Sequence, residues 1–377
     1  NRRMLHASRV TLILGPIRER SGRESFFVQV NPLRVGVVGT ASGSAVHIPG
    51  LRHVPLVDVA AVAGIDGNSA SSVAARYRIP DYFDDYRLMF RRARIDAVTI
   101  AVPAEYHHSV VISAVEHGLH ILCDAPMARS ATEARDMHRL ARDGQVFGSI
   151  VFPARCIPAR IRVKQLIDSG YIGRLQSISV TVFRSPQPSG RSMVPLEPKV
   201  SLIQQLGNDY VDTLRWWCGD VHAVSGARTA PAVADIEAQQ PNSNFAILLQ
   251  FGSGAVGSIH VCATSPIDLG DEVVIVGTDG MLALRNDSKI FGSKRDQHQI
   301  AELPIPDELT SDAPASVDPR VVPFAQLAYN WAHGVLHRES RSPSFEDGMK
   351  VQEIVDGAIK SQDLARWVDT SGKKWPV

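Results

Sequence analysis

The regular alternation of short β-branched runs with helical stretches between Leu33 and Met127 is the feature that most constrains the fold of this chain. The first run is 34–39 (RVGVVG) and the second is 57–63 (VDVAAVA). Because parallel strands need a long crossover connection, strands that alternate with helices indicate a parallel sheet with right-handed crossovers. We therefore predict a doubly wound domain with further strands at 97–102 and 120–123 and helices at 46–53, 69–77 and 107–117.

Beyond Ser149 the pattern changes, because strands follow one another without helices between them. Runs of this kind are typical of a largely antiparallel sheet with one packed face and one open face. The predicted elements are a helix at 161–169, strands at 175–183, 245–251, 255–263 and 272–276, a loop rich in Pro and Asp at 300–322, and helices at 324–337 and 347–367.

The predicted organisation is an α/β chain with an extension and two domains. Residues 1–33, which precede the first strong strand signal, are interpreted as a partly disordered extension. Residues 34–150 form a Rossmann domain with a doubly wound parallel sheet, which is typical of dinucleotide binding. Residues 151–377 form a C-terminal α+β domain with a large, mostly antiparallel, open sheet. A length of 377 residues fits two such cores.

The charge and cysteine content narrow the classes of function. The chain has 40 Lys+Arg and 39 Asp+Glu, so no net field attracts nucleic acid or an anionic membrane. No apolar run approaches the roughly 20 residues that span a bilayer, and the four cysteines are scattered without paired spacing. We therefore expect a cytoplasmic protein with reduced thiols and no metal site, whose ligand is a small molecule.

The turn after the first strand has the small residues that a dinucleotide-binding turn needs. Set against G-x-G-x-x-G, Ala41 and Ser44 occupy the second and third positions, and Gly43 adds flexibility one place early. Small residues let the backbone approach a pyrophosphate and let the next helix aim its N-terminus at it. The predicted cofactor contacts in this turn are Gly39, Ala41, Gly43, Ser44 and His47. A tight strand-to-helix turn without a ligand is the alternative.

An acidic residue that would hold the adenosine ribose is expected about 20 residues further on, at the end of the second strand. Gly64 occupies that place, and Asp66 is either an off-register substitute or a solvated turn residue. The sequence therefore predicts NAD or NADP without selecting between them, and weak or lost cofactor binding stays open.

From about Arg34 to Asp369 the chain resembles the Gfo/Idh/MocA oxidoreductases in one colinear register. The resemblance is carried by Gly39 with His47, Val102-Pro103 with His107, 116–127 (EHGLHILCDAPM), 166–173 (LIDSGYIG), Leu206-Gly207 with 212–216 (DTLRW), 276–280 (VGTDG) and 343–348 (PSFEDG). It implies NAD(P)-dependent hydride transfer on sugars, inositols and related alcohols, with the nicotinamide at the mouth between the domains. It also implies substrate binding in the C-terminal domain and a homo-oligomer formed through the open sheet. The cofactor contacts that it adds are Pro103, His107, Asp124 and Pro126.

Two catalytic segments of that family are altered in this chain. The family's Lys in a Glu-Lys-Pro segment corresponds to Ala125, and its His in a Gly-x-His-x-x-Asp helix corresponds to Asp209, while Asp212 is kept. Oxidation of an alcohol needs a base, typically worth roughly 10²–10⁴ in rate, and Ala125 cannot act as one. Asp209 and Asp212 lie three residues apart on a predicted helix and share a face, so one pKa is pushed upward. We predict that the pair acts as a base or holds a polyol or amine ligand; a polar helix end facing a wet cleft is the alternative.

Two basic residues complete the predicted site. Lys199 lies six residues before Gln205 and either swings a charge into the cleft in place of the missing lysine or stays on the surface. Arg155 matches a position at the start of the second domain that is often basic in the family, and we predict that it contacts substrate oxygens.

Three hypotheses about function follow from these observations. The first is an NAD(P)-dependent oxidoreductase with an atypical active site, acting on a sugar-like or other small polar alcohol or ketone. The second is a redox-inactive family member that binds a metabolite or serves as an accessory to a partner protein. The third is a lyase or isomerase that uses the same cleft. The cleft architecture, which is retained along the whole chain while only the reacting side chains have changed, favours the first, although fold resemblance does not fix function.

Overall fold

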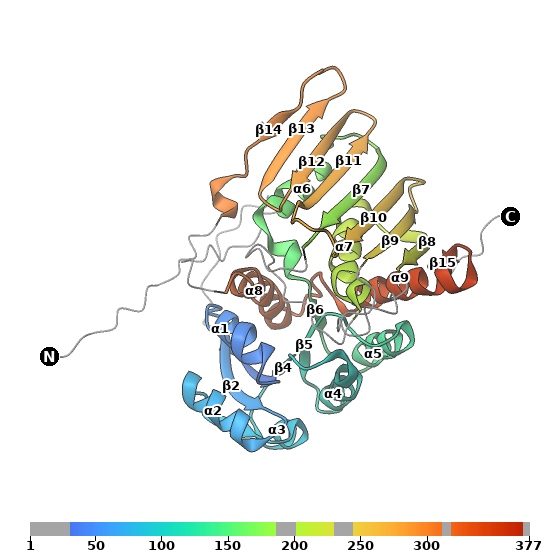
Figure 1. Cartoon of the computed structure of the whole chain (residues 1–377). Helices are drawn as coiled ribbons and strands as arrows, with labels where there is room; N and C mark the ends of the chain where they lie inside the picture. Colours follow the sequence, from blue (N-terminus) through green and yellow to red (C-terminus); the bar gives the residue numbers. More distant parts are fainter. Residues whose placement is uncertain (1–30, 186–200, 230–243, 311–317, 372–377) are drawn as a thin grey trace.

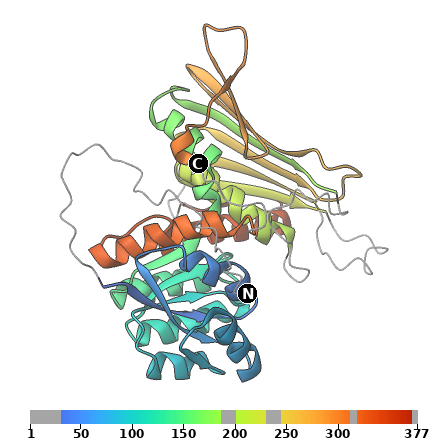
Figure 2. The ribbon, with the colours of Figure 1, turned by 90° about the vertical axis from the view of Figure 1, so that its left-hand side faces the viewer.

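Two β-sheets, one above the other in Figure 1, organise the computed structural model of this protein, which describes residues 31–185, 201–229, 244–310 and 318–371. The predicted extension lies almost wholly outside the described residues. In Figures 1 and 2 a layer of helices that includes α8 (Val321–His337) and α9 (Phe345–Leu364) separates the two sheets. The alternation in the first third of the chain and the run of strands in the middle therefore correspond to two different sheets.

The lower sheet has six parallel strands in the order β3-β2-β1-β4-β5-β6. Its strands are β1 Leu33–Val38, β2 Val57–Ala63, β3 Asp81–Phe83, β4 Ala97–Ile100, β5 His120–Asp124 and β6 Gly148–Val151. This is the dinucleotide-binding order, in which the strand sequence reverses between β1 and β4 and ligands bind beyond the carboxyl ends at that switch point. The predicted Rossmann sheet is confirmed.

Helices cover both faces of the lower sheet, because each strand returns through one. They are a π-helical turn η1 Gly43–His47 with α1 Ile48–Leu51, then α2 Gly67–Tyr77, α3 Tyr86–Arg92, α4 Ala104–Glu116 and α5 Ala131–Asp143. Side-chain oxygens of Asp66, Asp85 and Ser130 cap α2, α3 and α5. The helix predicted at 46–53 is thus two short segments that begin earlier and end at Leu51.

The upper sheet has nine strands in the order β14-β13-β12-β11-β7-β10-β9-β8-β15. They are β7 Leu175–Phe183, β8 Val221–Arg228, β9 Asn244–Phe251, β10 Val256–Cys262, β11 Gly270–Gly277, β12 Gly280–Arg285, β13 Lys289–Lys294, β14 Ala301–Leu303 and β15 Val368–Asp369. Neighbouring strands are antiparallel except β7 and β10, which run parallel. The predicted mostly antiparallel sheet is confirmed.

One face of the upper sheet is packed and the other is open, as the alternation in β7 indicated. Ile178, Val180 and Val182 are buried, whereas the alternate residues Ser177 and Thr181 are only half-buried. The packed face meets the helices α6 Pro158–Asp168 and α7 Leu202–Cys218 together with α9. The strands β7, β10 and β9 form the centre of the sheet above α7.

The two C-terminal helices join the sheets. Phe324 of α8 contacts Gly50 and the ring of His47 in the Rossmann domain. Helix α9 approaches both sheets, because a side chain at Gly348 would meet Ile150 of β6 and one at Gly226 of β8 would meet the backbone of Ala358. These contacts place α7 and α9 at the junction where the candidate site lies.

The loop predicted at 300–322 is wrong in part. Ala301–Leu303 forms strand β14 against β13, a short helical turn follows at Asp307–Leu309, and α8 begins at Val321. Edge pairing of three residues is a tertiary effect that a Pro-rich sequence does not reveal. Among the helices of the described ranges, none combines the length and apolar character needed to cross a bilayer.

Candidate functional site

The turn after β1 approaches the neighbouring strand so closely that only glycine fits at its first position. Gly39 has φ +114, and a Cβ there would lie 2.1 Å from the carbonyl oxygen of Ala101. At Gly43 a Cβ would lie 3.0 Å from a methyl group of Val37, so the following helix packs tightly on the strand. Ala41 and Ser44 lie between and beyond these glycines, and the turn leads directly into η1. The backbone is therefore shaped for a pyrophosphate at a helix N-terminus.

The end of β2 has no carboxylate at the place where a ribose would be held. A side chain at Gly64 would meet Ser69 Oγ at 2.7 Å and Thr40 Cγ2 at 3.0 Å. Asp66 is exposed and its Oδ1 accepts a hydrogen bond of 2.7 Å from the Ser69 amide, which caps α2. An acidic side chain at position 64 would therefore have to displace Ser69 or Thr40, and the cap already engages one oxygen of Asp66.

His47 is buried behind the turn and links two strands. Its Nδ1 lies 2.6 Å from Thr99 Oγ1 and its Nε2 lies 2.8 Å from Asp124 Oδ1, while its ring rests on Phe324. Asp124 is partly exposed at the carboxyl end of β5, with its other oxygen 3.5 Å from Ser42 Oγ. The structure thus brings Asp124 close to the turn after β1 and places His47 beneath both.

His107 supports the backbone beyond the carboxyl ends of β4 and β5. Its Nε2 lies 2.7 Å from the carbonyl oxygen of Val102 and its Nδ1 lies 3.2 Å from that of Met127. Burial lowers the pKa of this imidazole, so it is neutral at pH 7. Through these contacts the segment after β4, with exposed Pro103, and the segment after β5, with half-buried Pro126, lie side by side.

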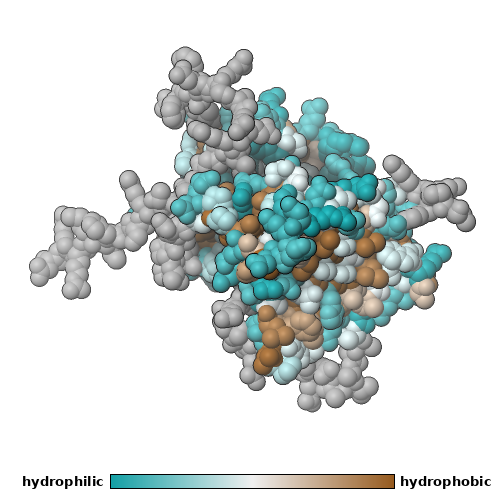
Figure 3. Space-filling model, turned by 90° about the horizontal axis from the view of Figure 1, so that it is seen from above, coloured by the Kyte–Doolittle hydropathy of each residue, from teal (hydrophilic) through white to brown (hydrophobic). Residues whose placement is uncertain are grey.

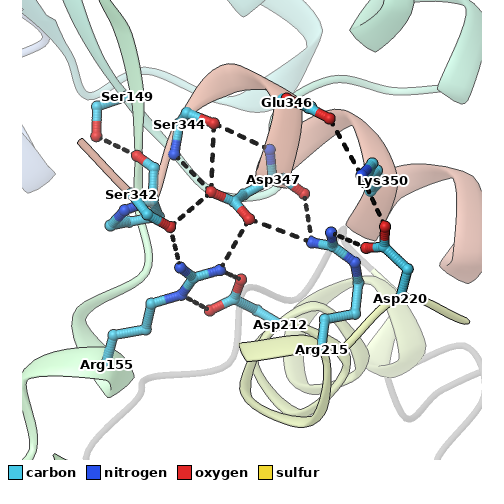
Figure 4. Close-up of polar contacts among 11 residues, drawn as sticks. Ser149, Arg155, Asp212, Arg215, Asp220, Ser342, Ser344, Glu346, Asp347 and Lys350 are labelled. Carbon is cyan, nitrogen blue, oxygen red and sulfur yellow. Dashed lines mark hydrogen bonds and ion pairs between the residues drawn. The ribbon is translucent and has the colours of Figure 1, made fainter. Parts of the chain in front are cut away.

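Asp212 of α7 is fully buried and forms a two-point ion pair with Arg155 (Figure 4). Arg155 Nε lies 2.8 Å from Asp212 Oδ2 and Arg155 Nη2 lies 2.6 Å from Asp212 Oδ1. Arg155 is itself buried in the short helical turn Pro153–Cys156 that leaves β6, so the pair fastens α7 to the end of the Rossmann domain.

Asp347 at the start of α9 extends this pair into a network. Its carboxylate lies 3.3 Å from Arg155 and 3.4 Å from Arg215, and it accepts hydrogen bonds from the Ser344 amide and the Ser342 hydroxyl. Burial alone would raise the pKa of Asp347, but Arg155 and these hydrogen bonds outweigh it and hold the pKa at about 2. We name Arg155, Asp212, Arg215, Ser342 and Asp347 the junction network; it joins β6, α7 and α9 (Figure 4).

Asp209 lies one turn before Asp212 and has different surroundings. Within the described ranges, no hydrogen bond or ion pair engages its carboxylate, although its backbone oxygen accepts from Thr213. Burial raises the pKa of Asp209 to about 6; Asp212 and Asp287 act in the same direction and Arg160 opposes them. The predicted pair therefore has one member that is paired with Arg155 and one whose carboxylate is not engaged by a hydrogen bond or ion pair among the described residues.

A second buried arginine beside Asp209 was not predicted from the sequence. Arg160 forms a two-point ion pair with Asp287, at 2.7 and 3.0 Å, and donates to Thr213 Oγ1 at 2.6 Å. Asp287 lies in the turn between β12 and β13, 127 positions from Arg160. No rule of sequence spacing connects residues so far apart. The only sign of this pair in the sequence was an arginine between apolar residues of α6. Lys199 lies outside the described residues.

The chain fits a dinucleotide at the carboxyl edge of the lower sheet, judged by its own geometry. Gly39 allows a tight turn that any Cβ would prevent, the backbone turns into a helix N-terminus, and Asp124 lies at the neighbouring strand end. In the parts of the chain that are described, His, Cys, Asp and Glu side chains form no group of three that could hold a metal ion.

Two family models match the chain. Residues 33–151 match "Oxidoreductase family, NAD-binding Rossmann fold", and residues 161–283 match "GFO/IDH/MocA C-terminal domain". Among curated proteins, the levoglucosan dehydrogenase of Pseudarthrobacter phenanthrenivorans is 23% identical over 89% of this chain and 98% of its own length. The inositol 2-dehydrogenase of Rubrobacter xylanophilus is 28% identical over 66% of this chain and 70% of its own length.

Solved structures share the whole architecture. A levoglucosan dehydrogenase in complex with NADH and levoglucosan has a TM-score of 0.79 at 23% identity, covering 90% of this chain and all of that one. An Agrobacterium radiobacter oxidoreductase in complex with NAD⁺, L-tartaric acid and magnesium has a TM-score of 0.78 at 19% identity, covering 90% and 99%. Both domain models, their order and the two sheets agree: the chain belongs to the Gfo/Idh/MocA family of NAD(P)-dependent oxidoreductases.

Proposed function

We propose that this protein oxidises or reduces a sugar-like or other small polar alcohol or ketone, with Asp209 as the group that moves the hydroxyl proton. The observation that carries the proposal is the Asp209 carboxylate, which is half-buried, unengaged within the described ranges, and has a pKa raised to about 6. The levoglucosan and inositol dehydrogenases among the relatives support a polyol-like substrate.

The proposed chemistry divides between the cofactor and the chain. A bound nicotinamide supplies the acceptor or donor of hydride. In the oxidative direction an Asp209 carboxylate oxygen takes the proton from the substrate hydroxyl, and in the reductive direction it returns it. A base with a pKa of about 6 is mostly ionised at pH 7, and this pKa is closer to 7 than the pKa of an ordinary aspartate. The turn at Gly39 and the Asp124 region hold the cofactor at the carboxyl edge of the lower sheet.

A second candidate function is a family member that binds a metabolite without redox chemistry. Two observations favour it: Ala125 has no proton to exchange, and the carboxylate of Asp212 is occupied by Arg155. Under this reading Asp209 would bind a ligand hydroxyl or amine and no turnover would occur.

The substitution Asp209→Asn separates the two candidates. Asparagine keeps the size of the side chain and cannot accept the proton, so we expect turnover on a polyol panel to fall roughly 10²–10⁴-fold. NADH affinity, measured by fluorescence titration, should stay within about twofold because the cofactor contacts lie on the lower sheet. The panel would contain levoglucosan, myo-inositol and glucose with either NAD⁺ or NADP⁺.

Asp363→Asn is the matched control, because Asp363 is exposed near the end of α9 and far from the junction. Turnover that survives in Asp209→Asn would remove Asp209 from the proton transfer. Cofactor binding without turnover on any substrate in the wild-type protein would favour the metabolite-binding candidate instead.

We also propose that the open face of the upper sheet forms a homo-oligomer. Register places Leu248 of β9 and Val256 of β10 on the same face, opposite to the buried residues Ile247 and Gly257. Leu248 is 49% and Val256 57% exposed. Seen from above, the sheet domain shows hydrophobic patches within a mostly hydrophilic surface (Figure 3). Exposed apolar groups of this kind are typical of subunit contacts.

A further inference from the structure

An open hollow of about 780 Å³ lies at the amino edge of the lower sheet, on the side away from the Gly39 turn. Its walls come from residues that begin strands or end helices: Gly118 and His120 at the start of β5, Phe147 and Gly148 at the start of β6, and Arg338 at the end of α8. Because strands of a parallel sheet begin at one edge and end at the other, the hollow is separate from the dinucleotide site.

The polar side chains of the hollow are mainly cationic or hydrogen-bond donors. Arg142, Arg338, His120 and His138 all line it. The lining contains one carboxylate, Glu346, and Figure 4 shows it turned to Lys350, with its Oε1 3.1 Å from Nζ. The local charge of the hollow is therefore positive.

Arg338 is the cation best placed to receive a ligand. Its guanidinium has no hydrogen bond or ion pair with any residue of the described ranges, whereas Arg142 is paired with Asp143 at 2.9 Å. Arg338 has φ +55, and Gln145, which also lines the hollow, has the same φ. These positions at helix C-termini favour glycine, yet each carries a long polar side chain, and both residues line the hollow.

His120 adds a donor with a defined direction. Its Nδ1 accepts a hydrogen bond of 3.0 Å from the Phe147 amide, so the ring hydrogen of the neutral form sits on Nε2. Burial lowers the pKa of this imidazole; the Asp96 carboxylate opposes this effect, Arg338 adds to it, and the ring is neutral at pH 7.

Part of the lining of the hollow is apolar, and we call this part the apolar floor. Val146, Phe147, Val335 and Phe345 contribute to it, and the Phe147 ring lies 5.3 Å from the His120 ring, centroid to centroid. A volume of about 780 Å³ falls within the range of roughly 300–1,000 Å³ typical of small-molecule sites and far exceeds that of an inorganic ion.

We propose that this hollow is a second ligand site that binds a small organic anion, with its phosphate or carboxylate group on Arg338 and His120 and its carbon skeleton on the apolar floor. The site is independent of the proposed catalytic function, because it lies at the opposite edge of the sheet. A ligand here contacts α5, α8 and the start of α9, and α9 carries Asp347 of the junction network.

Calorimetric titration of the full chain with glucose 6-phosphate, citrate and uncharged glucose tests the proposal. We expect at least one anion to bind at least tenfold more tightly than glucose. Comparison of glucose 6-phosphate with citrate shows whether the site prefers a phosphate or a carboxylate group. Arg338→Gln should weaken that binding about tenfold or more, because charge-assisted hydrogen bonds to guanidinium are among the strongest in proteins. Ser340→Glu, which adds a negative charge at the same wall, should weaken it as well.

Arg78→Gln is the matched control, since Arg78 is also an exposed arginine in the left-handed region at a helix C-terminus but lies at the end of α2. It should leave the affinity unchanged. Anion binding that is unaffected by both Arg338→Gln and Ser340→Glu, or that is displaced by saturating NADH, would place the anion elsewhere and overturn the proposal. Binding of neither anion above the level of glucose would also overturn it.

Discussion

At the scale of single residues, the surroundings of Asp209 have two opposite effects. They raise its pKa toward the range that suits a catalytic base, and they lower the stability of the folded state at neutral pH. The folded-state pKa of about 6 lies above the ordinary value of 3.8. Between these values the folded state keeps a proton that the unfolded state has released, so stability falls as pH rises from about 4 to about 6 and stays lower above it. Asp209→Asn is expected to raise the free energy of unfolding by about 1–3 kcal/mol at pH 8 and to change it little at pH 4.

Urea denaturation at the two pH values, with Asp363→Asn as the exposed control, measures this difference. An equal effect of Asp209→Asn at pH 4 and pH 8 would mean that the carboxyl has an ordinary pKa, and the proposed base would lose its main support.

Residue roles that depend on local backbone shape could be predicted from sequence, and roles that depend on distant partners could not. Gly39 follows a buried strand, so a turn of small residues leading into a helix could be predicted there, and the structure has that turn. The partner of Asp212 is Arg155, 57 positions away, and nothing in the helix containing Asp212 indicates it. Whether His47, Pro103 or Arg155 contacts a ligand stays a prediction.

At the scale of elements, the junction network fixes α7 against the Rossmann domain and α9. Among the described residues, Asp212→Ala would leave the buried guanidinium of Arg155 with Asp347 at 3.3 Å as its ion-pair partner and with a hydrogen bond to the Ser342 hydroxyl. Removing one partner of a buried pair costs about 3–5 kcal/mol, so we expect a loss of about 3 kcal/mol in the free energy of unfolding. The double variant Arg155→Met with Asp212→Leu should recover at least half of that loss, because no charge then remains unpaired.

The measurement is urea denaturation of the single and double variants. Asp168→Ala is the control, since its pair with Lys164 is exposed and worth less than about 1 kcal/mol. An equal loss in the free energy of unfolding in Asp168→Ala and Asp212→Ala would show that the junction network contributes no more to stability than an exposed ion pair.

Elements with a strong period were predicted well, and those shaped by tertiary contacts were not. Strand β7 alternates cleanly over Leu175–Phe183 and its predicted bounds agree with the structure. The edge strands β3 and β14 have three residues each, too few for a period to be visible, and they exist because a neighbouring strand offers pairing. The helix α5, ATEARDMHRLARD, was missed because its apolar stripe is thin among many charges.

At the scale of the whole molecule, the order of strand types predicted both sheets, but it could not predict how the C-terminal helices are shared. Helix α8 follows the last long strands of the upper sheet in sequence, yet Phe324 packs on Gly50 and His47 of the Rossmann domain. Helix position relative to a sheet is set by which apolar surfaces remain uncovered, and only the assembled fold decides that.

The proposed homo-oligomer is the prediction that belongs to the molecule as a whole. Leu248→Glu with Val256→Glu puts two charges on the open face of the upper sheet, at residues whose side chains contact no core. A symmetric contact repeats each change on both partners, so the charges repel and lose hydration, and the assembly should dissociate to a monomer of 41.0 kDa. Light scattering after size-exclusion chromatography gives the mass, and circular dichroism confirms folding.

Tyr82→Glu is the control for the oligomer prediction. It changes a side chain of similar exposure, 55%, on β3 of the lower sheet and should leave the mass unaltered. A wild-type protein that is already monomeric at micromolar concentration, or a double variant that keeps the wild-type mass, would show that this face is not the interface.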